Sequence, residues 1–315
     1  MATRLCTRGS STIVPRSSDT IAEATKGSPV LTFGSRVFPP AATLVMAIIN
    51  RTPDSFYDRG ATWDDGPALD RLDQVVAEGA DIVDIGGVKA APGTQVAPSE
   101  EVRRVAGFVA KTRDRYPDLV ISVDTYRSEV ARAVATEGAD ILNDAWGGWD
   151  PEVAQVAANY RLGLVCTHAG GVEPRTRPHR VRYSDVVADA VARTVTEAER
   201  AVELGVPRDS IVIDPGHDFG KNTRQSLTVT RGLPELVATG WPVLMSLSNK
   251  DFVGEVLDLP VGERLVGTLA ATAVCAWLGA RVFRVHEVAE TRQTLDMVAA
   301  IAGTAQPRVS VRGLA

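Results

Sequence analysis

The sequence predicts a (β/α)8 barrel, and three observations support this fold class. Short apolar runs alternate with amphipathic stretches along the chain. The runs contain few polar residues, which is typical of parallel strands buried on both faces. Polar residues follow each run, at the end of a barrel where ligands bind. The eight predicted strands cover residues 44–49, 82–85, 119–123, 141–142, 162–165, 211–213, 243–245 and 282–285.

The main alternative to a barrel is a doubly wound open sheet. That fold commonly carries a Gly-x-Gly-x-x-Gly motif after its first strand, and this chain has none there. The chain has 315 residues, and a barrel of this type takes ~250 as a single domain. We therefore expect a tail at residues 1–30, a barrel at 31–305 and a second tail at 306–315. Residues 31–33 and 36–38, joined by a Gly-Ser pair, predict a hairpin that caps one barrel end.

The segments between the strands carry recognisable helix starts and stops. Asp-Asp-Gly-Pro at 64–67 predicts a helix that begins with an Asp cap and has Pro in its first turn. Gly79 is expected to end that helix. The tetrad Glu-Gly-Ala-Asp occurs at 78–81 and again at 137–140, and each copy leads directly into a predicted strand. These signals agree with a repeated helix–strand unit.

Composition excludes several classes of protein. Hydrophobic residues make up 44% of the chain and charged residues 23%, as in ordinary globular proteins. A net charge of −5 argues against a nucleic-acid partner or an anionic membrane. No apolar stretch approaches the ~18 residues of a membrane span. The three cysteines lack metal-type spacing, so we expect reduced thiols in a cytoplasmic protein.

The residues after the strands predict a polar, ligand-binding mouth. Asp124 and Asp214 only accept hydrogen bonds when ionised, Asn143 both donates and accepts, and Lys250 only donates. Such a set suits a flat heterocycle with adjacent ring N–H, amine and carbonyl groups. A single Asp at a strand end is more often a turn or helix cap than a ligand-binding residue, but polar groups after all eight strands favour a site.

A second group of residues predicts an anion at the rim of the mouth. Arg284 and His286 follow the eighth strand, and barrels often bind phosphate near strands seven and eight. Arginine also matches the geometry of phosphate oxygens. Asn50, after the first strand, is a candidate ligand for a Mg²⁺ ion that also holds phosphate oxygens.

Several short motifs resemble those of dihydropteroate synthases. Residues 44–56 read Leu-Val-Met-Ala-Ile-Ile-Asn-Arg-Thr-Pro-Asp-Ser-Phe, close to the family's opening signature Met-Gly-Ile-Leu-Asn-Val-Thr-Pro-Asp-Ser-Phe. Five further motifs follow in family order: Val-Asp-Thr-Tyr at 123–126, Leu-Asn-Asp at 142–144, Asp-Pro-Gly at 214–216, Phe-Gly-Lys at 219–221 and Arg-Val-His-Glu at 284–287. The resemblance spans about residues 31–301 and implies a pterin-binding barrel. Related methyltetrahydrofolate-dependent methyltransferases share the pterin-binding barrel, but the Asn-x-Thr-Pro-Asp-Ser-Phe loop at 50–56 is more like that of the synthases.

The resemblance implies a reaction between p-aminobenzoate and 6-hydroxymethyl-7,8-dihydropterin diphosphate, in folate biosynthesis. By position, Asp124, Asn143, Asp214 and Lys250 would bind the pterin. Diphosphate would lie at Asn50, Arg284 and His286, with Mg²⁺ on Asn50. It also implies a homodimer through the last helices and binding of sulfonamide or sulfone analogues. The loops that would hold p-aminobenzoate contain Thr52, Pro53, Asp54, Ser55, Phe56, Lys89, Pro92, Gly93, Phe219 and Ser248.

The chain departs from the family at positions that bear on activity. The second loop reads Gly-Gly-Val-Lys-Ala-Ala-Pro-Gly at 86–93 instead of Gly-Gly-Glu-Ser-Thr-Arg-Pro-Gly, so Ala91 replaces an arginine. Asn249 replaces another in the usual Ser-Arg-Lys, and Ser246 stands before it. Asp218 adds a carboxylate that we expect close to the pterin. Three interpretations therefore remain: a working synthase, a paralogue with weak or lost activity that binds a pterin-like ligand, and a non-enzymatic binding protein.

Overall fold

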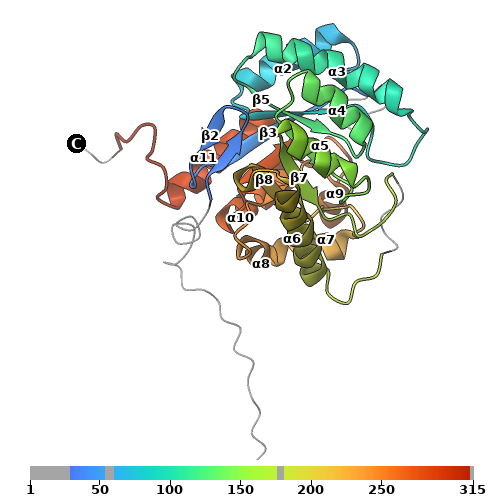
Figure 1. Cartoon of the computed structure of the whole chain (residues 1–315). Coiled ribbons are helices and arrows are strands. Elements are labelled where there is room, and N and C mark those ends of the chain that lie inside the picture. The colour runs from blue at the N-terminus through green and yellow to red at the C-terminus, as the bar shows by residue number, and fades with distance from the viewer. Residues whose placement is uncertain (1–28, 54–59, 176–180, 313–315) are drawn as a thin grey trace, which may run out of the picture.

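Eight parallel strands lie at the centre of the molecule (Figure 1), in the order β8-β7-β6-β5-β4-β3-β10-β9. The computed structural model describes residues 29–53, 60–175 and 181–312. A parallel bridge from Ile213 to Val243 joins the two ends of this order, because Val243 directly precedes β9. Helices surround the closed sheet, so the predicted (β/α)8 barrel is confirmed. The barrel strands are β3 (Leu44–Asn50), β4 (Ile82–Gly86), β5 (Val120–Asp124), β6 (Ile141–Asp144), β7 (Gly163–Thr167), β8 (Ile211–Asp214), β9 (Leu244–Met245) and β10 (Val282–Val285).

The connections between strands are mostly helical and follow the predicted alternation. The loop from β8 to β9 contains two helices, and so does the loop from β9 to β10. A short 3-10 turn, η2 (Arg208–Ser210), leads into β8. No helix in the described ranges is long and apolar enough to cross a membrane. The helices are α2 (Asp65–Ala77), α3 (Pro98–Arg115), α4 (Ser128–Thr136), α5 (Glu152–Tyr160), α6 (Val186–Leu204), α7 (Thr223–Arg231), α8 (Leu233–Val237), α9 (Asp251–Leu257), α10 (Leu265–Trp277) and α11 (Val288–Ile301).

The predicted hairpin forms and closes the amino end of the barrel. Strands β1 (Leu31–Phe33) and β2 (Arg36–Phe38) pair antiparallel. Their apolar side chains are buried in one cluster with residues from the first half of the barrel strands. The opposite, carboxyl end therefore remains available for ligands.

The helix signals are confirmed with one exception. Gly79 and Gly138 follow α2 and α4 with φ of 96° and 99°, a left-handed conformation that glycine adopts without strain. Asp64 occupies the N-cap position of α2, but its side chain makes no capping hydrogen bond. The predicted Asp cap is therefore correct in position and wrong in its bonding.

The alternation of side chains along β3 explains how the barrel places polar groups at its mouth. Successive side chains of a strand point to opposite faces. Val45, Ala47 and Ile49 belong to the large cluster between strands and helices. Met46 belongs instead to the cluster inside the barrel. Ile48 and Asn50 lie two and four residues after Met46 in the same strand, so their side chains share its inward face. Asn50 thus ends the inward-facing row, at the carboxyl end.

Candidate functional site

A cavity occupies the carboxyl end of the barrel and brings together residues from all eight barrel strands or the loops that follow them. The structure places in its wall each residue predicted to bind pterin or diphosphate. Their binding roles stay predictions. The polar and charged lining residues are Asn50, Thr52, Lys89, Asp124, Asn143, Thr167, Asp214, Ser246, Ser248, Lys250, Arg284 and His286.

The floor of this cavity is held by an ion-pair network around Arg284. Its Nε donates to Oδ2 of Asp84 at 2.6 Å, and its Nη2 donates to Oδ2 of Asp124 at 2.9 Å. Asp84 is fully buried and also accepts from Ser122 Oγ at 2.6 Å and Asn143 Nδ2 at 3.1 Å. Arg284 is therefore tied to two carboxylates, although the sequence suggested it as a phosphate ligand. Asp84 was predicted only as a polar residue at the end of the second strand and was given no role; its position inside an apolar strand is the signal for one.

Burial governs the protonation of the floor. Desolvation raises the pKa of Asp124 to about 7, although Arg284 acts to lower it; Asp84 raises it further. Burial also raises the pKa of Asp214, although the positive charge of Lys250 acts to lower it. Its Oδ1 accepts from the amide of Gly216 at 2.7 Å. A ligand that donates N–H groups to these carboxylates would favour their charged forms.

Two lysines support the walls near Asp214. Lys250 lies 4.9 Å from the centre of the Phe219 ring and donates to the carbonyl oxygen of His217. Lys221 is buried, and its Nζ donates to three carbonyl oxygens: His168 at 2.9 Å, Gly216 at 3.0 Å and Phe219 at 3.0 Å. Burial lowers the pKa of Lys221 to about 7. Lys221 joins the loops after β7 and β8, a role that its place in a Phe-Gly-Lys motif did not suggest.

Near β10 the rim is held by a hydrogen-bond network around His286. Ser248 Oγ lies 2.8 Å from His286 Nδ1 and 3.0 Å from Glu287 Oε2. Burial lowers the pKa of His286 to about 3, so the ring is uncharged at neutral pH. Asn249, which replaces a family arginine, is buried and donates from Nδ2 to Glu287 Oε1 at 2.7 Å. The substitution removes a cation and leaves a carboxylate at this side of the mouth.

The second loop is held from outside the barrel. Arg104 on α3 donates to the carbonyl oxygen of Gly87 at 3.0 Å. Arg175, in the loop after β7, donates from Nη1 to the carbonyl of Thr94 at 2.7 Å and from Nε to that of Ala91 at 3.3 Å. Arg175 thus bridges two loops whose contacting residues are 84 positions apart in the sequence.

The residues expected around p-aminobenzoate are only partly assembled. Thr52, Lys89, Phe219 and Ser248 line the mouth, whereas Pro53, Pro92 and Gly93 do not. Asp54, Ser55 and Phe56 lie outside the described residues. Thr52 and Thr167 have buried hydroxyl oxygens without a hydrogen-bond partner in the part of the chain that the structure describes. Such groups in a cavity wall suit a polar ligand.

One expectation about the mouth is wrong. Asp218 was expected beside the pterin, but it is absent from the cavity wall. Its Oδ2 accepts from the amide of Asp251 at 2.7 Å, at the start of α9. A carboxylate at a helix amino terminus satisfies otherwise unpaired N–H groups, which explains the position. Arg51, a new cation in the first loop, likewise points away: it pairs with Asp65 and lies 4.7 Å from the Phe108 ring centre.

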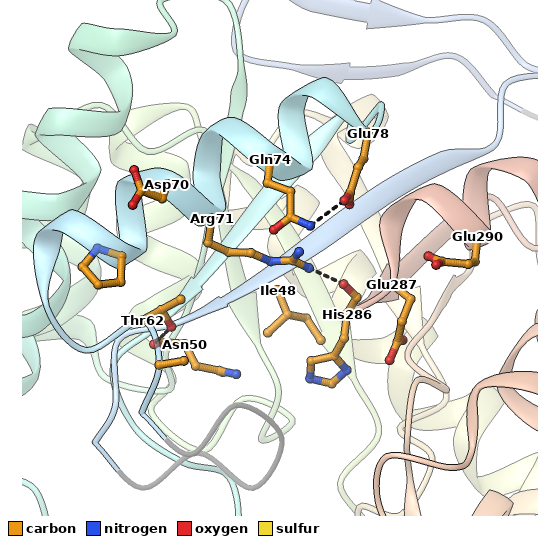
Figure 2. Close-up of a pocket in the computed structure, with 12 residues that line it drawn as sticks. Ile48, Asn50, Thr62, Asp70, Arg71, Gln74, Glu78, His286, Glu287 and Glu290 are labelled. Atoms are coloured by element: carbon orange, nitrogen blue, oxygen red, sulfur yellow. Dashed lines mark hydrogen bonds between the residues drawn. The ribbon is translucent and has the colours of Figure 1, made fainter.

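A second cavity of about 560 Å³ adjoins the mouth between α2 and α11 (Figure 2). The two cavities share Ile48, Asn50 and His286. Arg71 extends from α2 and donates to the backbone carbonyl of His286, and Gln74 donates to Glu78 at 2.7 Å. The sequence gave no indication of this cavity, because its wall comes from helix faces that look solvated. Its charged residues are Asp70, Arg71, Glu78, Glu287 and Glu290, beside the neutral His286.

This geometry defines a class: a (β/α)8 barrel whose carboxyl-end cavity combines buried carboxylates, an amide and a lysine, as recognition of a polar heterocycle requires. The family described as pterin binding enzyme matches residues 46–286. The inactive dihydropteroate synthase 2 of Mycobacterium leprae is 58% identical over 276 residues, which cover 86% of this chain and 95% of the relative. The chain therefore belongs to the pterin-binding enzyme family, as a divergent dihydropteroate synthase paralogue.

Solved structures agree with this assignment. A dihydropteroate synthase of Yersinia pestis, in a sulfonamide drug complex, superposes with a TM-score of 0.82 at 31% identity, covering 88% of this chain and 100% of the other. A dihydropteroate synthase of Coxiella burnetii, in complex with pteroic acid, gives a TM-score of 0.78 at 30% identity, with 88% and 100% covered. The barrel is thus shared with synthases that hold such ligands.

Proposed function

We propose that this chain is a pterin-binding paralogue in which dihydropteroate synthase activity is weak or lost. One observation carries the proposal: the heterocycle-facing groups are kept at the mouth, while the loops beside them lack two arginines of the family pattern. Asp124, Asn143, Asp214 and Lys250 line one cavity. Ala91 and Asn249 stand where the family has arginine. A relative 58% identical over most of its length carries the name of an inactive synthase, which supports the same conclusion.

The chemistry of the synthase reaction explains why these losses matter. Diphosphate leaves a CH2 group while an arylamine attacks that carbon, so rate depends on stabilising the leaving anion and orienting the amine. Two of the family's cations are missing from the loops that would do this. Arg284 remains, but it is engaged with Asp84 and Asp124. The retained floor supports binding, and the altered loops support weak turnover.

We also propose that Mg²⁺ has at most an accessory place here. Magnesium prefers oxygen ligands and often rests on one or two protein groups plus substrate phosphates. Asn50 offers an amide oxygen at the rim, which fits such a site. A Mg²⁺ ion held by Asn50 would complete its coordination shell with oxygens of the ligand and of water.

A homodimer through the last helices is part of the same proposal. Val266 and Val274 on α10 are 79% and 52% exposed, and Met297 and Ile301 on α11 are 61% and 62% exposed. Exposed apolar side chains gathered on two adjacent helices favour a protein contact. Sedimentation velocity should give the mass of a dimer, and Val266→Glu with Val274→Glu should give a monomer. A wild-type monomer at micromolar concentration would contradict this part.

The experiment that tests the function compares binding with turnover. Calorimetric titration with 6-hydroxymethylpterin should show saturable binding that Asp214→Ala abolishes in a folded protein. A coupled assay for diphosphate release, with the pterin diphosphate, p-aminobenzoate and Mg²⁺, should show little release. Turnover at the rate of a typical synthase would favour the working enzyme. No pterin binding would favour a role in protein interaction.

A further inference from the structure

The cavity that adjoins the mouth between α2 and α11 carries an excess of negative charge. Four carboxylates and one guanidinium line the cavity between α2 and α11. That guanidinium, Arg71, already donates to the carbonyl of His286 (Figure 2). The other cations lie in the mouth itself: Arg284 is paired with Asp84 and Asp124, Lys250 donates to the carbonyl oxygen of His217, and Lys89 comes from the second loop. In the cavity between α2 and α11 the carboxylates outnumber the cation, so a diphosphate placed there would be repelled.

The geometry gives this cavity a direct path to the heterocycle site. It adjoins the mouth at Ile48, Asn50 and His286, so a group attached to a ring in the mouth would extend into it. Its volume of about 560 Å³ exceeds what a single methylene-linked group needs.

We propose that the physiological ligand is a pterin-like heterocycle whose substituent is neutral or positively charged, not phosphorylated, and that this substituent lies between α2 and α11. Hydroxyl and ammonium groups donate hydrogen bonds, and Asp70 and Glu290 offer acceptors for them. The inference rests on the proposed pterin binding and narrows it. It also gives a physical reason for the loss of family cations: a ligand without diphosphate does not need them.

The test uses three probes on the full-length protein: 6-hydroxymethylpterin, 6-(aminomethyl)pterin and 6-hydroxymethylpterin diphosphate, each titrated with and without Mg²⁺. Wild type should bind the first two at least tenfold more tightly than the diphosphate. Asp70→Asn combined with Glu290→Gln should strengthen diphosphate binding and weaken aminomethylpterin binding, each at least threefold. The matched control, Glu129→Gln with Glu235→Gln on α4 and α8, changes net charge equally and should leave both affinities within twofold.

The possible outcomes separate the inference about the substituent from the proposed pterin binding. If the diphosphate binds most tightly to wild type, the inference about the substituent is overturned while pterin binding stands. The same holds if the cavity variant and the control shift the affinities equally, because the effect would then be one of net charge. If none of the three probes binds, the proposed function fails, and this inference fails with it.

Discussion

Replacing Arg284 with methionine should lower the free energy of unfolding by ~3–5 kcal/mol, the usual cost of removing one member of a buried ion pair. The estimate follows from the structure. The guanidinium makes two charged hydrogen bonds, at 2.6 Å to Asp84 and 2.9 Å to Asp124. At ~1.5–3 kcal/mol each, they give ~3–6 kcal/mol. Asp124 can take up a proton at little cost, because its pKa already lies at about 7, so the lower half of the range is expected.

Urea unfolding at pH 7.5 measures this change, with Arg308→Met as the matched control. Arg308 pairs with Asp296, but the two side chains are 84% and 42% exposed. Exposed pairs of this kind contribute ~0–1 kcal/mol. Adding Asp84→Asn to Arg284→Met should recover part of the loss, because it removes a buried charge without a partner. If Arg284→Met costs no more than Arg308→Met, the ion-pair network is not what holds the floor of the mouth.

Three further predictions concern pH, ligand binding and the loops. Burial lowers the folded-state pKa of His286 to about 3, below the 6.5 of an unfolded chain. Between these values the folded state binds fewer protons than the unfolded state, so the free energy of unfolding falls as pH drops from 6.5 toward 3. The free energy of unfolding of His286→Asn, measured from pH 4 to 7, should fall less than that of wild type, and equal slopes would contradict this. Pterin affinity should rise from pH 6 to 7.5 as Asp124 ionises, and calorimetry on Asp124→Asn should show a flat profile; the same slope in both proteins would assign the effect to another group. Arg175→Met should speed hydrogen exchange at residues 91–94 while lowering stability by less than ~1 kcal/mol, and unchanged exchange would show that Arg175 does not hold the second loop.

The fold could be predicted because each part of the barrel has a local signal in the sequence. Apolar runs mark the strands, glycines such as Gly79 mark the helix ends, and polar residues such as Asn50 mark the mouth. Each of these signals lies within a few residues of the feature it predicts. The convergence of Asp124 and Asp214 on one cavity then follows from the topology, because parallel strands of a barrel end on the same side.

The partners of the site residues could not be predicted in the same way. Arg284 meets Asp84 across 200 residues of sequence, and Arg175 meets the second loop across more than 80. Such pairs depend on side-chain directions inside the closed barrel, which local patterns do not encode. Asp218 was assigned to the mouth by motif position alone. In the structure the amino terminus of α9 attracts its carboxylate instead.

Loop grafting separates the missing cations from other causes of weak turnover. Replacing residues 88–91 with Glu-Ser-Thr-Arg, together with Asn249→Arg, should raise the rate of diphosphate release if the lost arginines limit it. Arg at 249 must find room where Asn249 is buried against Glu287, so a thermal melt of the graft is the control for folding. No gain in a folded, pterin-binding graft would point to a different ligand, as the charge of the cavity between α2 and α11 suggests.

The central claim, binding without efficient synthesis, is tested most directly by the rate of diphosphate release with both family substrates and Mg²⁺, under conditions where titration has established pterin binding. We expect a rate close to that of the reaction without protein, while the Yersinia pestis dihydropteroate synthase assayed beside it turns over normally. A rate equal to that of the Yersinia enzyme would contradict the claim and make this chain a working synthase whose altered loops are tolerated.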